Sequence, residues 1–81
     1  MPLVKVNELL HHATENGYGV AAVNVFNYET IKWVAEAANR ERIPGIIQFY
    51  PGFDKYIALK HVAAIAKDFA EKSSVPIGVH L

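Results

Sequence analysis

The feature that most constrains this chain is a repeated junction in which a proline leads into a short apolar segment. It occurs as Ile43-Pro44-Gly45-Ile46-Ile47 and again as Val75-Pro76-Ile77-Gly78-Val79, and the two prolines lie 32 residues apart. Proline stops a helix and pushes the residue before it into an extended conformation. The repeat therefore predicts helices and strands in alternation, with parallel strands joined by right-handed crossovers.

Three stretches have apolar residues spaced as on one face of a helix, and each has residues suited to its ends. The predicted inward faces are Val6, Leu9, Leu10 and Ala13; Ile31, Val34, Ala35 and Ala38; and Leu59, Val62, Ala63, Ala66 and Ala70. Asparagine and aspartate favour the first position of a helix, whereas glycine closes a helix in the left-handed conformation. The predicted helices run from about Val6 to Asn16-Gly17, from an Asn27 cap to Pro44, and from an Asp54 cap to Ser73-Ser74.

Three apolar runs between these helices are typical of strands. The run Val20–Tyr28 does not alternate between polar and apolar residues, which indicates a strand buried on both faces, as in a parallel sheet covered by helices. The predicted strands span about Gly19–Val25, Gly45–Phe49 and Ile77–Leu81.

The spacing of 32 residues equals the length of one unit in a (β/α)8 TIM barrel, which takes about 250 residues in all. The predicted fold class is therefore α/β, namely the N-terminal βα units of a TIM barrel preceded by a short capping helix. We expect residues 1–81 to form one incomplete barrel domain of three strands and three helices. Its outer strands would expose unpaired backbone groups.

The composition excludes several classes of protein. Eight basic and eight acidic residues cancel, so there is no basic surface for nucleic acid. No apolar run approaches the roughly 20 residues that span a bilayer, and no signal peptide is recognisable. The chain has no cysteine and hence no disulfide. We expect a cytoplasmic protein that binds neither nucleic acid nor membrane.

Polar side chains at the ends of the three predicted strands are the candidates for function: Asn24, Gln48 with Tyr50, and His80. In β/α folds the C-terminal ends of the strands meet at one face, where sites collect. Each of these residues also has a structural interpretation, because buried polar groups generally hydrogen-bond to backbone. Their convergence by itself names no reaction.

The remaining histidines do not predict a metal site. His11 and His12 are adjacent and point about 100° apart on a helix, so they do not face one ion. His61 has no partner at ligand spacing. Because no set of residues reproduces a zinc ligand pattern, we expect no metal ligand within the chain.

Several segments, taken in order, resemble the start of class II, metal-dependent ketose-bisphosphate aldolases. They are Pro2-Leu3-Val4, Glu8-Leu9-Leu10, Asn16-Gly17-Tyr18, Val23-Asn24-Val25-Phe26-Asn27-Tyr28-Glu29-Thr30, Pro44-Gly45-Ile46-Ile47-Gln48 and Val75-Pro76-Ile77-Gly78-Val79-His80-Leu81. The resemblance covers essentially the whole chain. The family includes fructose- and tagatose-bisphosphate aldolases and has the (β/α)8 barrel.

The resemblance implies retro-aldol cleavage of a ketose 1,6-bisphosphate to dihydroxyacetone phosphate and an aldehyde, a reaction of glycolysis and related carbohydrate metabolism. A zinc ion held by histidines polarises the carbonyl and stabilises the enediolate. In the family the third strand ends His-Leu-Asp-His-Gly, with the aspartate as proton donor and the next histidine as metal ligand. This sequence ends at His80-Leu81, so we expect no catalytic residue within it and predict that the isolated chain is inactive.

The resemblance also implies roles for four residues. Asn24 matches an asparagine that lines the substrate pocket, and Gln48 belongs to a Gln-Phe-Ser pattern in which the serine contacts substrate. Tyr50 replaces that serine and fills more of the pocket. His80 resembles a strand residue that supports the site without binding metal. The full-length enzyme is expected to bind a sugar phosphate and to form a homo-oligomer.

Two other hypotheses remain open. One is a small self-contained α/β module that serves binding or interaction without catalysis. The other is a barrel enzyme that uses no metal. An aldolase fragment should expose an apolar edge of the third strand and an uncovered helix face, whereas a self-contained module should bury both.

Overall fold

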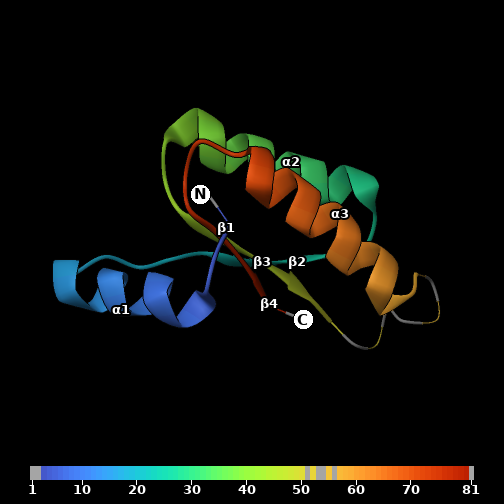
Figure 1. Cartoon of the computed structure of the whole chain (residues 1–81), viewed down its shortest axis with the longest axis horizontal. Coiled ribbons are helices and arrows are strands. Elements are labelled where there is room, and N and C mark those ends of the chain that lie inside the picture. Colours follow the sequence, from blue (N-terminus) through green and yellow to red (C-terminus); the bar gives the residue numbers. More distant parts are fainter. Residues whose placement is uncertain (1–2, 51, 53–54, 56, 81) are drawn as a thin grey trace.

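A computed structural model describes residues 3–50, 52, 55 and 57–80. Within this part of the chain, short connections join four parallel strands and three helices (Figure 1). The strands are β1 (Leu3–Val4), β2 (Ala22–Val25), β3 (Gly45–Phe49) and β4 (Ile77–His80). The helices are α1 (Val6–Asn16), α2 (Tyr28–Glu41) and α3 (Leu59–Lys72).

The sheet has the strand order β1-β4-β3-β2, and all its pairs are parallel. The three longer strands therefore follow the chain order across the sheet, as successive βα units do. Two backbone hydrogen bonds start these strands in register, from Ile46 N to Ala21 O (3.0 Å) and from Gly45 N to Pro76 O (3.2 Å). The prolines thus stand at the entry to the sheet, as the repeat predicts.

The hydrophobic core lies between the sheet and the pair α2 and α3, which lie together on one face (Figure 1). Alternate residues of each strand point to this face. Its buried members include Val25, Ile47, Phe49 and Ile77 from the strands, Ile31 and Ala38 from α2, and Val62, Ala66 and Ala70 from α3. We call this side of the sheet the helix face.

The opposite face of the sheet, which we call the open face, carries α1 at the N-terminal ends of the strands. Leu9 and Ala13 are the buried residues of that helix. Gly78 permits the close approach, because a Cβ atom there would lie only 3.0 Å from Val6 Cγ2. The predicted capping helix is therefore confirmed as a helix that covers part of this face.

Helix ends follow the predicted residues in most cases. Asn27 caps α2 by accepting a 2.8 Å hydrogen bond from the backbone N–H of Thr30. Gly17 closes α1 with φ of 70°. Arg42, with φ of 58°, closes α2 two residues before Pro44, so a non-glycine residue adopts the left-handed conformation here.

The structure corrects three predictions. β2 begins at Ala22 instead of Gly19, and the exposed Ala22, Val23 and Asn24 show that it is not buried on both faces. The physical reason is that β2 is an edge strand, since no strand of the described residues pairs with its outer side. The third helix begins at Leu59 instead of near Asp54, and both Asp54 and Leu81 lie outside the described residues.

The third correction concerns the other edge of the sheet. A fourth strand, β1, pairs with β4 through Leu3↔Ile77 and Val4↔Gly78, so the edge that was predicted to be open is covered along its first half. Two residues carry too little periodicity to indicate a strand. In the part of the chain that the structure describes, no helix is long and apolar enough to cross a membrane.

Candidate functional site

The candidate site is a row of polar side chains across the C-terminal halves of β2, β3 and β4. Parallel register aligns Asn24 with Gln48, and Gln48 with His80. All three residues alternate with core residues along their strands, so they project from the open face. The structure therefore brings together three of the four residues that the sequence indicated. We call Asn24, Gln48 and His80 the amide–histidine row.

Hydrogen bonds connect the three side chains in sequence. Gln48 Nε2 donates to Asn24 Oδ1 at 2.9 Å, and Gln48 Oε1 lies 3.3 Å from His80 Nδ1. Asn24 and His80 are exposed, and Gln48 between them is half-buried. The row is thus linked internally while its two outer residues remain accessible.

Tyr50, the fourth predicted residue, is not among the aligned positions of the row. It follows the last residue of β3 directly, and its side chain is 56% exposed. Its ring lies against Gly52, where a Cβ atom would come within 2.2 Å of Tyr50 Cε2. Gly52 therefore leaves room for the aromatic ring next to the strand end.

The first turn of α2, just after β2, contains Thr30, a residue that was not among the predicted site residues. Thr30 Oγ1 accepts hydrogen bonds from the backbone N–H groups of Phe26 and Asn27, each at 3.1 Å. Together with the Asn27 cap, this forms a reciprocal capping box. The signal was the Asn-x-x-Thr spacing, and its effect is to fix the chain just beyond Asn24.

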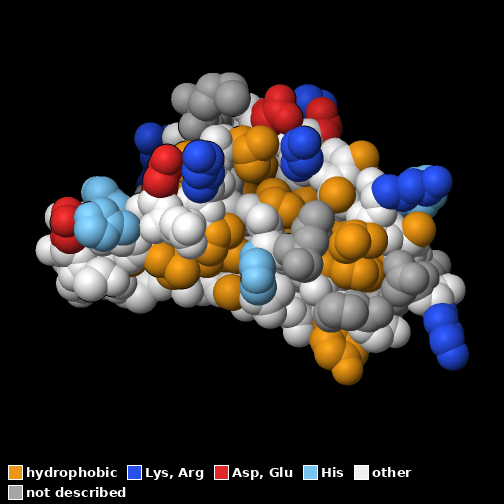
Figure 2. All heavy atoms as spheres, turned by 60° about the horizontal axis from the view of Figure 1, so that its bottom comes forward, with side chains coloured by type: hydrophobic (Ala, Val, Ile, Leu, Met, Phe, Trp, Pro, Cys, Tyr) orange, Lys and Arg blue, Asp and Glu red, His pale blue; other side chains and the backbone are white. Residues whose placement is uncertain are grey.

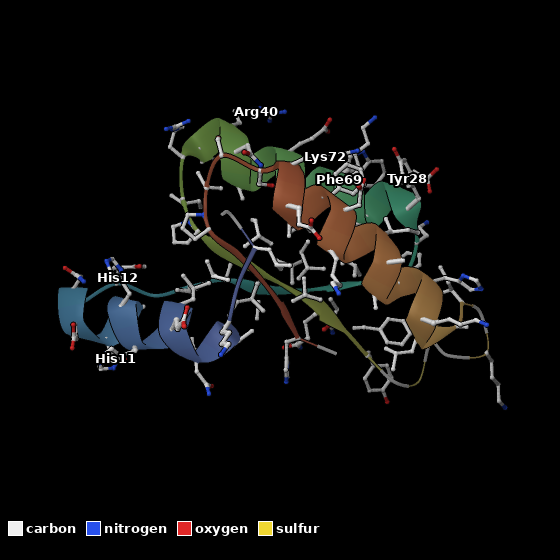
Figure 3. The ribbon with its side chains drawn as sticks, in the orientation of Figure 1. His11, His12, Tyr28, Arg40, Phe69 and Lys72 are labelled. Carbon is white, nitrogen blue, oxygen red and sulfur yellow. The ribbon has the colours of Figure 1, made fainter. Side chains whose placement is uncertain are left out.

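The other histidines have separate surroundings, as predicted. His11 Nε2 pairs with Glu15 Oε1 at 2.7 Å, whereas His12 Nδ1 lies 2.6 Å from the Tyr18 hydroxyl. The two rings project in different directions from α1 (Figure 3). His61 is exposed on α3. Among the described residues, no three histidine, cysteine or acidic side chains are grouped so that they could hold a metal ion.

The comparison with known families matches residues 4–81 to the model of class-II fructose-bisphosphate aldolase. The chain belongs to the class-II fructose-bisphosphate aldolase family. The parallel sheet with its polar strand ends is therefore part of an aldolase-family fold, and the resemblance found in the sequence is confirmed.

Solved structures of aldolases are similar to this chain. The YdjI aldolase from Escherichia coli K12 superposes with a TM-score of 0.89 at 29% identity, over 96% of this chain and 30% of that one. A Coccidioides immitis protein assigned as a fructose-1,6-biphosphate aldolase gives 0.82 at 30% identity, over 95% of this chain and 26% of that one. The chain thus spans less than a third of these aldolases' length.

Class-II aldolases generally use a divalent metal, but the described residues do not provide a site for one. Within the amide–histidine row, His80 is the residue that could bind a metal ion, and the other two members, Asn24 and Gln48, are amides. Divalent zinc prefers histidine nitrogen, cysteine sulfur and carboxylate oxygen. The row is consequently suited to hydrogen bonding with a ligand and not to holding a metal by itself.

Proposed function

We propose that these 81 residues are the N-terminal portion of a class II aldolase that completes a (β/α)8 barrel. The reaction is reversible retro-aldol cleavage of a ketose 1,6-bisphosphate to dihydroxyacetone phosphate and an aldehyde. The observation that carries the proposal is the amide–histidine row at the strand ends of a chain that belongs to this family.

The barrel is supported by the open edge of β2 and the apolar surface beside it. Trp33 on α2 is 62% exposed, and Val23 on β2 is 41% exposed. Both line a groove of about 290 Å³ that also includes Ile43 and Ala37. Large exposed apolar side chains next to an unpaired strand indicate a surface that another strand and helix cover.

The open face gives the same indication. Figure 2 shows hydrophobic side chains along the middle of this side of the molecule, with charged side chains mainly towards its margins. In a closed barrel the inward-pointing side chains pack in layers, so an apolar inner surface with polar strand ends is the expected pattern.

Substrate contacts are proposed for Asn24, Gln48 and Tyr50, with His80 as support. The amides supply donors and acceptors that suit the hydroxyl and carbonyl oxygens of a sugar phosphate. Tyr50 stands where many members of the family have a serine, and its larger ring narrows the space for the aldehyde half of the substrate. We place the zinc ligands and the proton donor outside the described residues.

The test is a coupled assay for dihydroxyacetone phosphate with fructose and tagatose 1,6-bisphosphates. A protein that carries this segment in a complete barrel should cleave at least one of them, and a chelator should abolish the cleavage. The 81-residue chain alone should cleave neither. A complete protein without chelator-sensitive cleavage of either ketose would contradict the proposal.

Asn24→Ala provides a sharper test in the complete enzyme. Loss of one or two hydrogen bonds to substrate costs about 1–3 kcal/mol, which lowers kcat/KM roughly tenfold to a hundredfold. Asn16→Ala is the matched control, because Asn16 lies at the exposed end of α1, where its side chain donates a hydrogen bond to the His12 carbonyl of the same helix. Equal losses in both variants would assign Asn24 a structural role.

A further inference from the structure

The hydrogen bonds of the amide–histidine row have a direction. Each carboxamide carries a donor at one end and an acceptor at the other, so Gln48 presents its oxygen to one neighbour and its nitrogen to the other. Its nitrogen faces Asn24 Oδ1 and its oxygen faces His80 Nδ1. A carbonyl oxygen only accepts hydrogen bonds, so the proton of this second contact must come from the histidine ring.

We infer that Gln48 is a positioning residue that holds His80 in its Nδ1–H form and leaves Nε2 as the unprotonated ring nitrogen. The tautomer of a histidine is set by the hydrogen bond that its other nitrogen makes. The same arrangement occupies the oxygen of Asn24 and leaves its NH₂ group as a donor. One end of the row therefore donates, and the other accepts.

The direction of these hydrogen bonds would orient a ligand at the site. That the ligand is a ketose phosphate rests on the proposed function. Neighbouring strands lie about 4.8 Å apart, so a row over three strands spans roughly 10 Å. A phosphorylated ketose carries both carbonyl or hydroxyl oxygens that accept and hydroxyl groups that donate. The Asn24 NH₂ group would donate to an oxygen of the ligand, and His80 Nε2 would accept a proton from a ligand hydroxyl. A ligand bound in the opposite orientation would not satisfy both hydrogen bonds.

The opposite direction is the alternative that the experiment must separate. With the Gln48 amide reversed, its nitrogen would donate to His80 Nδ1, the ring would carry its proton on Nε2, and Asn24 would donate to Gln48. The two arrangements exclude each other at every bond. The tautomer of the His80 ring therefore shows which way both amides, Gln48 and Asn24, are oriented.

The experiment is a long-range proton–nitrogen NMR correlation of the histidine rings in the 15N-labelled 81-residue chain. It is recorded at about pH 8.5, well above the ordinary imidazole pKa of about 6.5, so that neutral rings are observed. His80→Gln identifies the His80 signals, and the exposed His61 serves as an internal reference, because a free imidazole favours Nε2–H. We expect His80 to carry its proton on Nδ1.

Two variants separate positioning from simple packing. Gln48→Leu removes both ends of the amide at similar size, and His80 should change to the Nε2–H form. Asn24→Asp leaves only an acceptor beside Gln48, which enforces the observed direction, so His80 should keep Nδ1–H. If Gln48→Leu does not fold, Gln48→Glu replaces it, since a carboxylate also accepts from Nδ1–H and should preserve that form.

Each outcome decides the inference. An Nε2–H ring in the unmodified chain overturns it, and so does an Nδ1–H ring that persists in folded Gln48→Leu or disappears in Asn24→Asp or Gln48→Glu. These results do not depend on activity. Failure of the aldolase assay would overturn the proposed reaction and leave the tautomer measurement valid.

Discussion

The two faces of the sheet differ in what their side chains do, although they alternate along the same strands. On β3, Ile47 is fully buried under α2 and α3, while its neighbour Gln48 points to the open face and bonds to two other strands through its side chain. The helix face contains the core, whereas the C-terminal part of the open face carries the polar row. Adjacent residues of one strand therefore differ in role: Ile47 belongs to the core, whereas Gln48 belongs to the row for which we propose substrate contacts.

The largest expected effect comes from truncating the core on the helix face. Ile47→Ala removes a fully buried side chain at the centre of the sheet and should lower the free energy of unfolding by about 2–5 kcal/mol. Urea denaturation followed by circular dichroism measures this change.

Gln48→Ala on the next residue is the matched control. It should lower the free energy of unfolding by only about 0.5–1.5 kcal/mol, because the side-chain hydrogen bonds that are lost lie in a partly exposed row and no core side chain is removed. Similar losses at both positions would show that the row also stabilises the fold and would break the comparison between the faces.

A smaller effect is expected where α1 covers the open face. Gly78→Ala would place a Cβ atom 3.0 Å from Val6 Cγ2, and this crowding should cost about 1–3 kcal/mol. Gly45→Ala is the control on the helix face, because the nearest atom there, Ala38 Cβ, lies 3.9 Å away, an ordinary contact.

Thermal denaturation of the two glycine variants compares the faces directly. Gly45→Ala should be neutral, or stabilise by up to about 1 kcal/mol through the lower entropy of its unfolded chain. If Gly78→Ala is equally tolerated, then α1 is not packed tightly against the sheet, and the N-terminal part of the open face is as accessible as its polar end.

The smallest effect sharpens the comparison at the point where β2 passes into α2. Asn27→Ala removes the cap and should cost about 1 kcal/mol, because the backbone N–H of Thr30 loses its acceptor. The His80 tautomer should remain unchanged in the same variant, since Asn27 is not bonded to the row in the structure. A change in tautomer would show that the cap also positions Asn24.

The sequence allowed much of the helix face to be predicted. The spacing of Ile31, Ala35 and Ala38 identified the buried side of α2, and Asn27 identified its start. The prediction for α3 was right about Val62, Ala66 and Ala70, but Leu59 is exposed and the start was placed too early. The helix begins after Ala58, which provides no side-chain cap, so there was no capping residue to recognise.

The open face could be predicted only in part. Strand alternation and parallel register were enough to propose that Asn24, Gln48 and His80 converge. Their bonding order was not accessible, because a sequence does not say which end of an amide faces which neighbour. The exposure of β2 was also missed, because a continuous apolar run looks alike in a central strand and in an edge strand.

By itself, the sequence determined the three helices and the three longer strands of this protein, the parallel arrangement of those strands and its membership of the aldolase family, because these depend on local periodicity, caps, prolines and a family pattern. Only the tertiary structure decided that β1 covers half of the β4 edge, that α1 needs Gly78, and that Gln48 joins Asn24 to His80. These are contacts between residues distant in sequence, and their geometry exists only after the strands have paired.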